Sequence, residues 1–151
     1  MSAPTSMSRA ELLNEARGWL GTPYRHQASC KGAGADCLGL IRGLYRAGMG
    51  AEPEAPPPYT PDWGEAAGGA RESLLEAARR HLLEKEREAM RPGDVLLFRV
   101  MERGPIKHCS VLSGEGRMIH AYSGRAVCET VLGPYWRARL THVFAFPFIG
   151  E

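Results

Sequence analysis

Apolar residues in the first third of the chain recur at intervals of three and four positions, the spacing of one face of an α-helix. One run follows a Ser-x-x-Glu sequence at Ser8, typical of a helix N-terminus, and stops before Gly21. Another begins after Asp36, a good N-cap residue, and can end at Gly48 or Gly50. We therefore predict two amphipathic helices, the first of about three turns. Their apolar faces consist of Leu12, Leu13, Ala16, Trp19 and Leu20 in the first helix and Leu38, Ile41, Leu44 and Tyr45 in the second.

The segments that flank the second helix show little periodicity. Residues 22–24 are expected to be extended, and residues 31–35 are too rich in Gly and Ala to form a regular element. Five prolines fall within residues 53–61, which favours an exposed, polyproline-like loop. Helical periodicity returns from Ala70 to Glu88, and we predict a third helix there. Its inward positions are Leu74, Leu75, Ala78, Leu82 and Leu83.

The pattern changes after residues 91–94, an Arg-Pro-Gly-Asp turn sequence, from helical periodicity to short β-prone runs separated by glycines. These runs cover residues 95–100, 108–112, 118–122, 126–132 and 143–148. Strands joined by short connections pair mainly antiparallel. Helices first and strands afterwards predict an α+β fold, and the length predicts a single domain that spans residues 1–151.

Composition narrows the class of protein. Hydrophobic residues make up 44% and charged residues 24% of the 151-residue chain, as in an ordinary globular domain. The formal net charge is only +2 and no basic run is present, so nucleic acid is not an expected partner. No apolar stretch approaches the ~20 residues that span a bilayer, and we expect no membrane insertion. Residues 1–9 lack the pattern of a signal peptide, which favours synthesis in the bacterial cytoplasm.

The cysteines offer the first candidate for chemistry. All four are expected to be free thiols, because a chain of this length needs no disulfides and the cytoplasm is reducing. Cys37 stands at or beside the first turn of the second helix, where the helix dipole and backbone N–H groups favour a thiolate. This position suits a nucleophile, and the same N–H groups can stabilise an oxyanion. A buried structural cysteine is the alternative interpretation.

Two histidines, His108 and His120, lie on neighbouring predicted strands. A three-residue loop that pairs residue 112 with residue 116 places the two imidazoles directly opposite each other, with Cβ atoms ~4.5–5.5 Å apart. The other face then carries an apolar set suited to a core, which consists of Cys109, Val111, Ile119 and Ala121. A two-residue loop or a β-bulge changes this register.

A thiol and two imidazoles match the parts of a Cys-His-polar catalytic triad. In that interpretation His108 takes the proton of Cys37, and His120 fixes the tautomer and orientation of His108. A zinc site that adds Cys109 is one alternative, but no close Cys-x-x-Cys or His-Glu-x-x-His spacing supports it. An ordinary half-buried histidine pair is another. We expect no metal and no other cofactor.

The same residues belong to a series of motifs that resembles the NlpC/P60 family of cysteine peptidases. In chain order the motifs are Gly21-Thr22-Pro23-Tyr24-Arg25, Asp36-Cys37-Leu38-Gly39-Leu40, Pro92-Gly93-Asp94-Val95-Leu96-Leu97-Phe98, His108 and Ile119-His120-Ala121. The resemblance runs from about Ala10 to Pro147. The Leu-Gly-Leu sequence after the cysteine resembles the subgroup encoded in phage tail clusters and in phage-like gene transfer agents.

The resemblance implies a papain-like core, in which the helix of the nucleophile packs on an antiparallel sheet, and hydrolysis of peptidoglycan stem peptides. The bond is typically the one between γ-D-glutamate and diaminopimelate or lysine. Cys37 corresponds to the nucleophile, His108 to the base and His120 to the third polar residue. Tyr24 corresponds to a tyrosine near the nucleophile that can contact the oxyanion or the substrate. Asp36 corresponds to a position that can bind a stem-peptide amine.

Two features depart from the family pattern. The strand of the base reads His108-Cys109-Ser110-Val111 where the family usually has His-Val-Gly-Ile, which adds bulk near the site and can reduce activity. The length leaves no room for a separate wall-binding domain, so targeting is expected to come from a partner such as a phage-like tail hub or baseplate. The protein is then expected to be carried on a particle and to act in the cell wall or periplasm.

Two other functions are compatible with the same features. A structural tail-tip or hub subunit, with weak or lost activity, would use residues 53–61 and the Phe-rich C-terminus as docking surfaces. An amidase or acyltransferase on the same core would share the triad and differ in substrate. The identity of the products separates the two kinds of enzyme.

Overall fold

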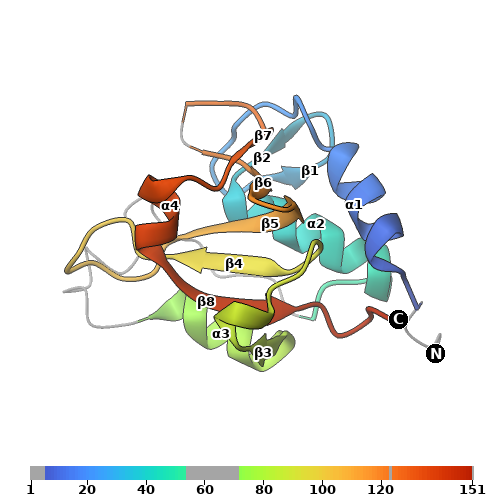
Figure 1. The fold of residues 1–151 in the computed structure, drawn as a ribbon. Coiled ribbons are helices and arrows are strands. Elements are labelled where there is room, and N and C mark those ends of the chain that lie inside the picture. The colour runs from blue at the N-terminus through green and yellow to red at the C-terminus, as the bar shows by residue number, and fades with distance from the viewer. Residues whose placement is uncertain (1–5, 54–71, 123, 151) are drawn as a thin grey trace.

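The computed structural model describes residues 6–53, 72–122 and 124–150 (Figure 1). Its elements, in chain order, are α1 (Arg9–Arg17), β1 (Ser29–Cys30), β2 (Gly34–Ala35), α2 (Cys37–Met49), α3 (Ser73–His81), β3 (Leu83–Lys85), the 3-10 helix η1 (Arg87–Ala89), β4 (Val95–Phe98), β5 (His108–Gly114), β6 (Arg117–His120), β7 (Cys128–Val131), α4 (Pro134–Arg139) and β8 (Leu140–Ala145). All five predicted strands are present with shifted bounds. The proline-rich segment 53–61 lies, apart from Pro53, outside the described residues.

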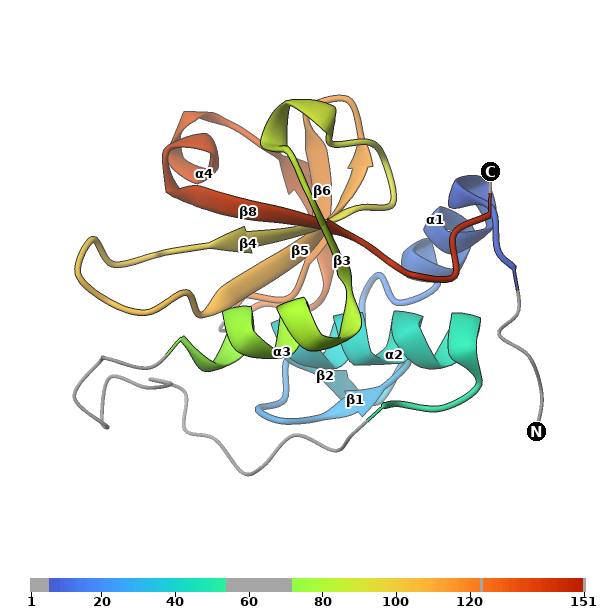
Figure 2. The same cartoon turned by 90° about the horizontal axis from the view of Figure 1, so that it is seen from below.

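One antiparallel sheet, with strand order β3-β8-β4-β5-β6-β7, forms the centre of the fold, and β1 and β2 pair separately. The helices α2 and α3 lie along one face of the sheet, and α4 lies on the opposite side (Figure 2). This arrangement confirms the predicted α+β class. We call the two sides the helix face and the α4 face. The helix face includes Val95, Leu97, Cys109, Val111, Ile119 and Phe144, and the α4 face includes Leu96, Phe98, Leu112, Met118, Leu132 and Val143.

Both N-terminal helices begin at the predicted caps. The Ser8 hydroxyl accepts a hydrogen bond from the backbone N–H of Glu11, and the Glu11 carboxylate accepts one from the backbone N–H of Ser8, each at 3.0 Å. The helix α1 ends at Arg17, earlier than predicted, and Trp19 lies in the turn beyond it. The helix α2 ends at Met49 and is capped by Gly50, whose φ of 86° is the left-handed conformation that glycine adopts most readily.

The start of α2 packs very close to other parts of the chain. The Asp36 carboxylate caps the helix by accepting from the backbone N–H of Gly39 at 2.7 Å. A Cβ atom at Gly39 would lie 1.8 Å from the carbonyl oxygen of Ala28, and one at Gly43 would lie 2.0 Å from the Trp19 ring. Glycine at these two positions therefore lets α2 closely approach the loop that precedes it and the turn that follows α1.

The glycine-rich segment contains a short strand that was not predicted. The strand β2, Gly34–Ala35, pairs antiparallel with β1, so the expectation of no regular element in residues 31–35 is wrong at its end. Strand pairing uses backbone groups and requires no β-prone side chain. A Cβ atom at Gly34 would lie 2.5 Å from Cδ of Arg25, so a residue without a side chain is needed where the Arg25 side chain crosses the strand.

The predicted third helix is shorter than its sequence pattern. The helix α3 ends at His81, and residues 83–85 form β3, which pairs with β8 at the edge of the sheet. The prediction of one helix through Glu88 is therefore wrong after residue 81. The apolar positions fit either structure, but an extended backbone lets β3 satisfy the free N–H and C=O groups of β8. Leu83, predicted to face inward, is 58% exposed in this edge strand.

The helix α4 is the other element that the pattern did not predict. It has six residues with Pro134 in its first turn, which is too short for apolar periodicity to be recognised. Its side chains nevertheless cover the α4 face, where Trp136 packs against the smaller hydrophobic cluster. None of the helices within the described ranges is long and apolar enough to cross a lipid bilayer.

Candidate active site

Cys37 is the first residue of α2 and lies half-buried where this helix meets the sheet. Its Sγ atom is 3.9 Å from the carbonyl oxygen of Lys107, the residue immediately before β5. Successive residues of a strand point to opposite faces, and a group at the end of a strand can reach both. Both His108 and Cys109, which lie on opposite faces of β5, are therefore close enough to the Cys37 thiol to lower its pKa.

The surroundings of Cys37 favour its thiolate form. The pKa of this thiol is lowered to about 5, first because the Cys109 thiol donates a hydrogen bond to it, and then because His108 provides a hydrogen bond and positive charge. Burial and the negative charge of Asp36 oppose the shift. Cys109 responds in the opposite direction, since its pKa is raised well above the usual value by the same hydrogen bond and by burial. Cys37 is therefore the more acidic of the two thiols.

His108 and His120 form a hydrogen-bonded pair, as the sequence predicted. The distance from Nε2 of His108 to Nδ1 of His120 is 2.9 Å, the ring centroids are 5.1 Å apart, and both residues are buried. Because Nε2 of His108 is used in this contact, Nδ1 is the nitrogen left to face Cys37. The geometry brings one thiol and two imidazoles into a single cluster.

The predicted register of the β5–β6 hairpin is wrong by two residues. Val111 pairs with Ile119 and Leu112 with Met118, and a bulge follows before Gly114. Extending this register places residue 110, not residue 108, opposite residue 120. The bulge takes up an additional residue near the turn. A shift of two residues preserves the face of every side chain, so the imidazoles stay on one face as diagonal neighbours. The predicted apolar set, Cys109, Val111, Ile119 and Ala121, is buried on the opposite face.

The outer histidine is held in its neutral form and has a second partner. Burial, with a smaller contribution from the charge of His108, lowers the pKa of His120 to about 3. Its Nε2 atom lies 3.1 Å from the hydroxyl of Thr130 on β7. Sequence reasoning missed Thr130, because threonine is common in strands and gives no separate signal there.

Aromatic rings cover the histidine pair on the α4 face. The Trp136 ring stacks on His108 with centroids 4.9 Å apart and planes at 27°, and meets His120 edge-on at 5.5 Å. Tyr122 meets His108 edge-on at 5.4 Å, and Phe98 lies 5.7 Å from it. Trp136 could not be placed near the histidines from its sequence pattern, because α4 is too short to show helical periodicity. Its position holds the imidazole of His108 between packed rings.

Tyr24 and Asp36, the two predicted substrate or oxyanion contacts, both lie near the nucleophile. Tyr24 is half-buried, and its pKa is raised by burial and by the negative charges of Asp36 and Cys37. The Asp36 carboxylate is buried, and its two oxygens accept hydrogen bonds from the backbone N–H groups of Gly39 and Gln27, each at 2.7 Å. The carboxylate thus fixes both the start of α2 and the preceding loop.

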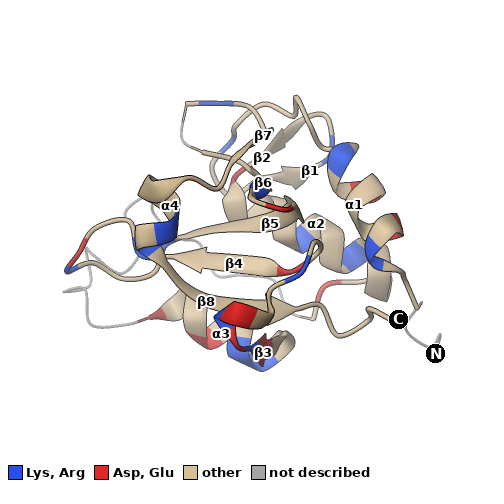
Figure 3. Ribbon diagram, in the orientation of Figure 1, with Lys and Arg blue, Asp and Glu red and all other residues tan. Residues whose placement is uncertain are grey.

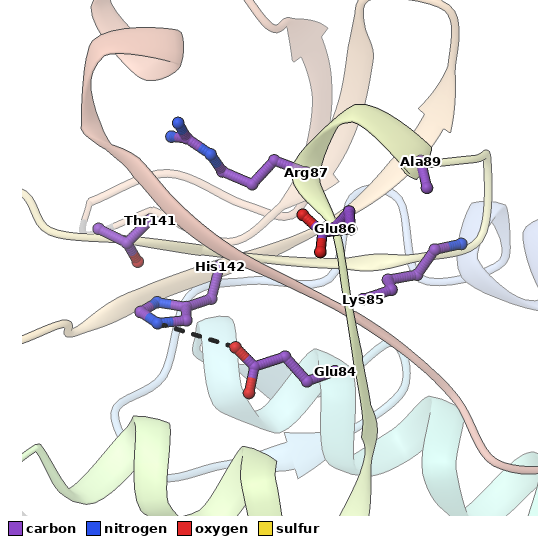
Figure 4. A pocket seen from close by; sticks show the side chains of 7 residues that line it. All are labelled: Glu84, Lys85, Glu86, Arg87, Ala89, Thr141 and His142. Atoms are coloured by element: carbon purple, nitrogen blue, oxygen red, sulfur yellow. Dashed lines mark ion pairs between the residues drawn. The ribbon is translucent and has the colours of Figure 1, made fainter.

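Other polar features lie away from this cluster. A surface hollow between β3, η1 and β8 is lined by Glu84, Lys85, Glu86, Arg87, Ala89, Thr141 and His142, and none of the predicted site residues lines it (Figure 4). Charged side chains of both signs occur along α1 and α3, whereas β4 and β5 are largely uncharged (Figure 3). In the part of the chain that the structure describes, no group of three or more His, Cys, Asp and Glu side chains is arranged to hold a metal ion.

Comparison with known proteins identifies relatives of this chain. The profile of the NlpC/P60 family matches residues 21–145. The chain is 24% identical to Gamma-DL-glutamyl hydrolase of Bacillus subtilis over 147 residues, which cover 97% of this chain and 31% of that protein. It thus spans about a third of the length of this curated relative.

Solved structures show the same fold. A crystal structure of an NlpC/P60 family protein from Bacillus cereus superimposes with a TM-score of 0.69 at 21% identity, covering 93% of this chain and 41% of that one. The NlpC/p60 domain of the peptidoglycan hydrolase SagA gives a TM-score of 0.63 at 19% identity, covering 93% of this chain and all of that domain. Both similarities extend over nearly the whole of the present chain.

Proposed function

Because the chain belongs to the NlpC/P60 family, we propose that it is a cysteine peptidase that hydrolyses peptidoglycan stem peptides, with Cys37 as nucleophile, His108 as base and His120 as the third member of the triad. Two observations support the proposal: His108 and His120 are hydrogen-bonded at 2.9 Å, and the surroundings of Cys37, with Cys109 and His108 contributing most, lower its pKa to about 5. A thiol with this pKa is largely thiolate at neutral pH. A purely structural cysteine has no need of such surroundings.

The proposed reaction has two steps. The Cys37 thiolate attacks the carbonyl carbon of the amide, and His108 delivers a proton to the leaving amine, which breaks the C–N bond and leaves an acyl-enzyme. Water then attacks the thioester, with His108 accepting its proton, and the carboxylic acid product departs as the thiol is restored. Throughout, neutral His120 accepts the hydrogen bond from Nε2 of His108 and holds that ring in place.

The oxyanion of each step forms beside the start of α2. Cys37 is the first residue of that helix, so the backbone N–H groups of its first turn and the positive end of the helix dipole lie next to the reacting carbon. The Tyr24 hydroxyl is proposed as a further donor, since Tyr24 is close enough to Cys37 and Asp36 for their negative charges to raise its pKa. Both carboxylate oxygens of Asp36 already accept hydrogen bonds from backbone N–H groups. We therefore propose that Asp36 attracts the stem-peptide amine through its negative charge, and not by a dedicated hydrogen bond.

For the bond, we propose a γ-D-glutamyl amide to diaminopimelate or lysine. The names of two relatives support this choice, since one is a Gamma-DL-glutamyl hydrolase and the other a peptidoglycan hydrolase. The sequence departs from the usual family strand at Cys109 and Ser110, and Ser110 adds a side chain close to the proposed base where the family usually has glycine. We therefore expect a narrower range of substrates than an enzyme with smaller residues would accept.

For the setting, we propose delivery to the cell wall on a phage-like tail, in contact with its hub or baseplate. The Leu38-Gly39-Leu40 sequence after the nucleophile supports this subgroup assignment. Immunodetection of the protein in gradient-purified particles tests it. A signal that co-sediments with tails is expected, and its absence from intact particles would rule the setting out without affecting the proposed chemistry.

Digestion of purified sacculi tests the proposed reaction. The wild-type protein and the Cys37→Ala variant are incubated with sacculi that contain diaminopimelate or lysine, and the soluble fragments are identified by mass spectrometry. We expect fragments that end in free γ-D-glutamate from the wild type only. Equal release by the two proteins would disprove thiol catalysis, and fragments cut between glycan and peptide would indicate an amidase instead.

A further inference from the structure

The hydroxyl of Thr130 extends the line of hydrogen bonds beyond the proposed triad. Nε2 of His120 lies 3.1 Å from Oγ1 of Thr130, while Nδ1 of the same ring lies 2.9 Å from Nε2 of His108. Thr130 pairs with Met118 across the β6–β7 ladder, and residues 118 and 120 share a face of β6. The sheet register therefore aims the hydroxyl at the imidazole of His120.

The direction of the proton transfer fixes where each ring must carry its hydrogen. If Nδ1 of His108 receives the proton of Cys37, then Nε2 of His108 carries a hydrogen both before and after the transfer. That N–H needs an acceptor, which is Nδ1 of His120. A neutral His120 with a lone pair on Nδ1 has its own hydrogen on Nε2, and this buried N–H needs an acceptor in turn.

We propose that Thr130 is a positioning residue, whose hydroxyl accepts the Nε2–H of His120 and thereby holds this ring in the tautomer that receives a hydrogen bond from His108. The inference rests on the proposed function, because it assigns His108 as the base. Burial independently keeps His120 neutral, so the ring has a single N–H and two possible places for it.

Without the hydroxyl the other tautomer becomes competitive. In that tautomer the hydrogen of His120 lies on Nδ1 and faces the Nε2–H of His108, so that two donors oppose each other. The conflict is relieved if the hydrogen of His108 moves from Nε2 to Nδ1, the nitrogen that faces Cys37. A His108 ring in that state cannot take the thiol proton. The other groups around His120 are the rings of His108, Tyr122 and Trp136, which come from β5, the segment after β6 and α4.

Nitrogen-15 NMR of the histidine side chains tests the proposal on the wild-type protein. Correlations from the ring carbons to the two ring nitrogens show which nitrogen of a neutral imidazole carries hydrogen. For His120 we expect hydrogen on Nε2 between about pH 5 and pH 8. Hydrogen on Nδ1, or a doubly protonated ring in this range, would overturn the proposal. This measurement requires neither substrate nor enzymatic activity.

The Thr130→Val variant tests the functional consequence, since valine keeps the shape and removes the hydroxyl. We expect kcat to fall about tenfold with little change in KM, as losing a buried hydrogen-bond partner is enough to shift a tautomer equilibrium by that factor. Thr130→Ser keeps the hydroxyl and should restore most of kcat. A Thr130→Val protein with wild-type kcat and an unchanged pH profile would overturn the role of the hydroxyl.

A matched threonine provides the control. The Thr141 hydroxyl donates to the carbonyl oxygen of Leu97 at 3.1 Å, so Thr141→Val removes a comparable hydrogen bond from β8 without touching either imidazole. Its kcat should equal that of the wild type. The rate at which iodoacetamide alkylates Cys37 can be measured by peptide mass spectrometry over a range of pH. This measurement tests the positioning role of Thr130 separately from the proposed peptidase activity. A change in this profile with Thr130→Val supports the positioning role even if the wild type leaves sacculi intact, and an unchanged profile contradicts it.

Discussion

The two faces of β5 illustrate different ways of burying residues. On the helix face, Cys109 and Val111 are buried against α2 in the larger hydrophobic cluster. On the α4 face, His108 is also buried but polar, and its Nε2 atom lies 2.9 Å from Nδ1 of His120. A buried apolar residue needs only partners of the right shape, whereas a buried polar residue needs partners at hydrogen-bond distance. The apolar side chains of the first face therefore contribute mainly to stability, and the histidine of the second contributes mainly to the proposed chemistry.

Cys37 is where the two faces meet. Its sulfur atom lies at the end of β5, with the Cys109 thiol on one side and the His108 imidazole on the other. The nucleophile thus depends on both faces, although it belongs to neither. Substitutions on each face should accordingly separate effects on folding from effects on reactivity.

Removal of the base should have the largest effect. In His108→Ala the thiol loses its proton acceptor, and we expect kcat on stem peptides to fall by about 10²- to 10⁴-fold. The melting temperature should stay close to the wild-type value, because the packing of the helix face is unchanged. His142→Ala, on β8 between β3 and β4, is the matched control and should retain full activity. More than a tenth of the wild-type kcat in His108→Ala would exclude this residue as the base.

A cavity on the helix face should reduce stability and leave kcat nearly unchanged. Ile119 is fully buried and pairs with Val111, so Ile119→Ala should lower the free energy of unfolding by about 2–5 kcal/mol. Chemical denaturation measures this loss, and kcat per folded molecule should stay near the wild-type value. Val131→Ala, at a side chain that is 62% exposed, should cost less than about 0.5 kcal/mol. A stable Ile119→Ala protein with reduced kcat would contradict the division between the faces.

The helix face is also the part that the sequence predicted best. Apolar periodicity and caps located α1 and α2, and alternation along residues 108–112 separated the packed residues from the histidines. Face assignment has a period of two, so it survived an error of two residues in the hairpin register. The proximity of His108 and His120 could thus be predicted without the correct pairing.

The α4 face was less predictable because its contacts depend on tertiary structure. A six-residue helix has too few turns to show periodicity, and Trp136 at its centre therefore had no assigned neighbour. The contact of Thr130 with His120 follows from the β6–β7 register, which the sequence pattern does not determine. The end of α3 was mispredicted for a related reason, since the free edge of β8 decides the structure of residues 83–85.

Removal of the stacked indole should reduce activity moderately. Trp136→Leu keeps an apolar side chain on α4 but loses the ring that stacks on His108, and we expect kcat to fall about fivefold, or about 1 kcal/mol. The loss should appear in kcat because the ring positions the base. Tyr135→Leu changes an exposed ring on the same helix and should have little effect. An equal loss in the two variants would mean that the helix, and not the stacking, matters.

The smallest effect at neutral pH is expected for Cys109→Val, which keeps an apolar side chain beside His108 and removes the thiol. The hydrogen bond from the Cys109 thiol is the largest cause of the lowered pKa of Cys37; without it, this pKa should rise above about 5. Fewer Cys37 side chains are then ionised between pH 5 and pH 6, whereas almost all remain ionised above neutrality. The pH dependence of iodoacetamide alkylation at Cys37 measures the midpoint.

The direction of this shift distinguishes the two faces once more. If Cys109 acted only as an apolar filler, valine would leave the alkylation midpoint in place and alter only the free energy of unfolding. Cys30→Ser, at an exposed thiol on β1, supplies the control for nonspecific effects of removing a cysteine. An upward midpoint shift confined to Cys109→Val would show that the helix face contributes to reactivity through a single hydrogen bond. A midpoint that is unchanged or moves downward would leave His108 as the main source of the acidity of Cys37.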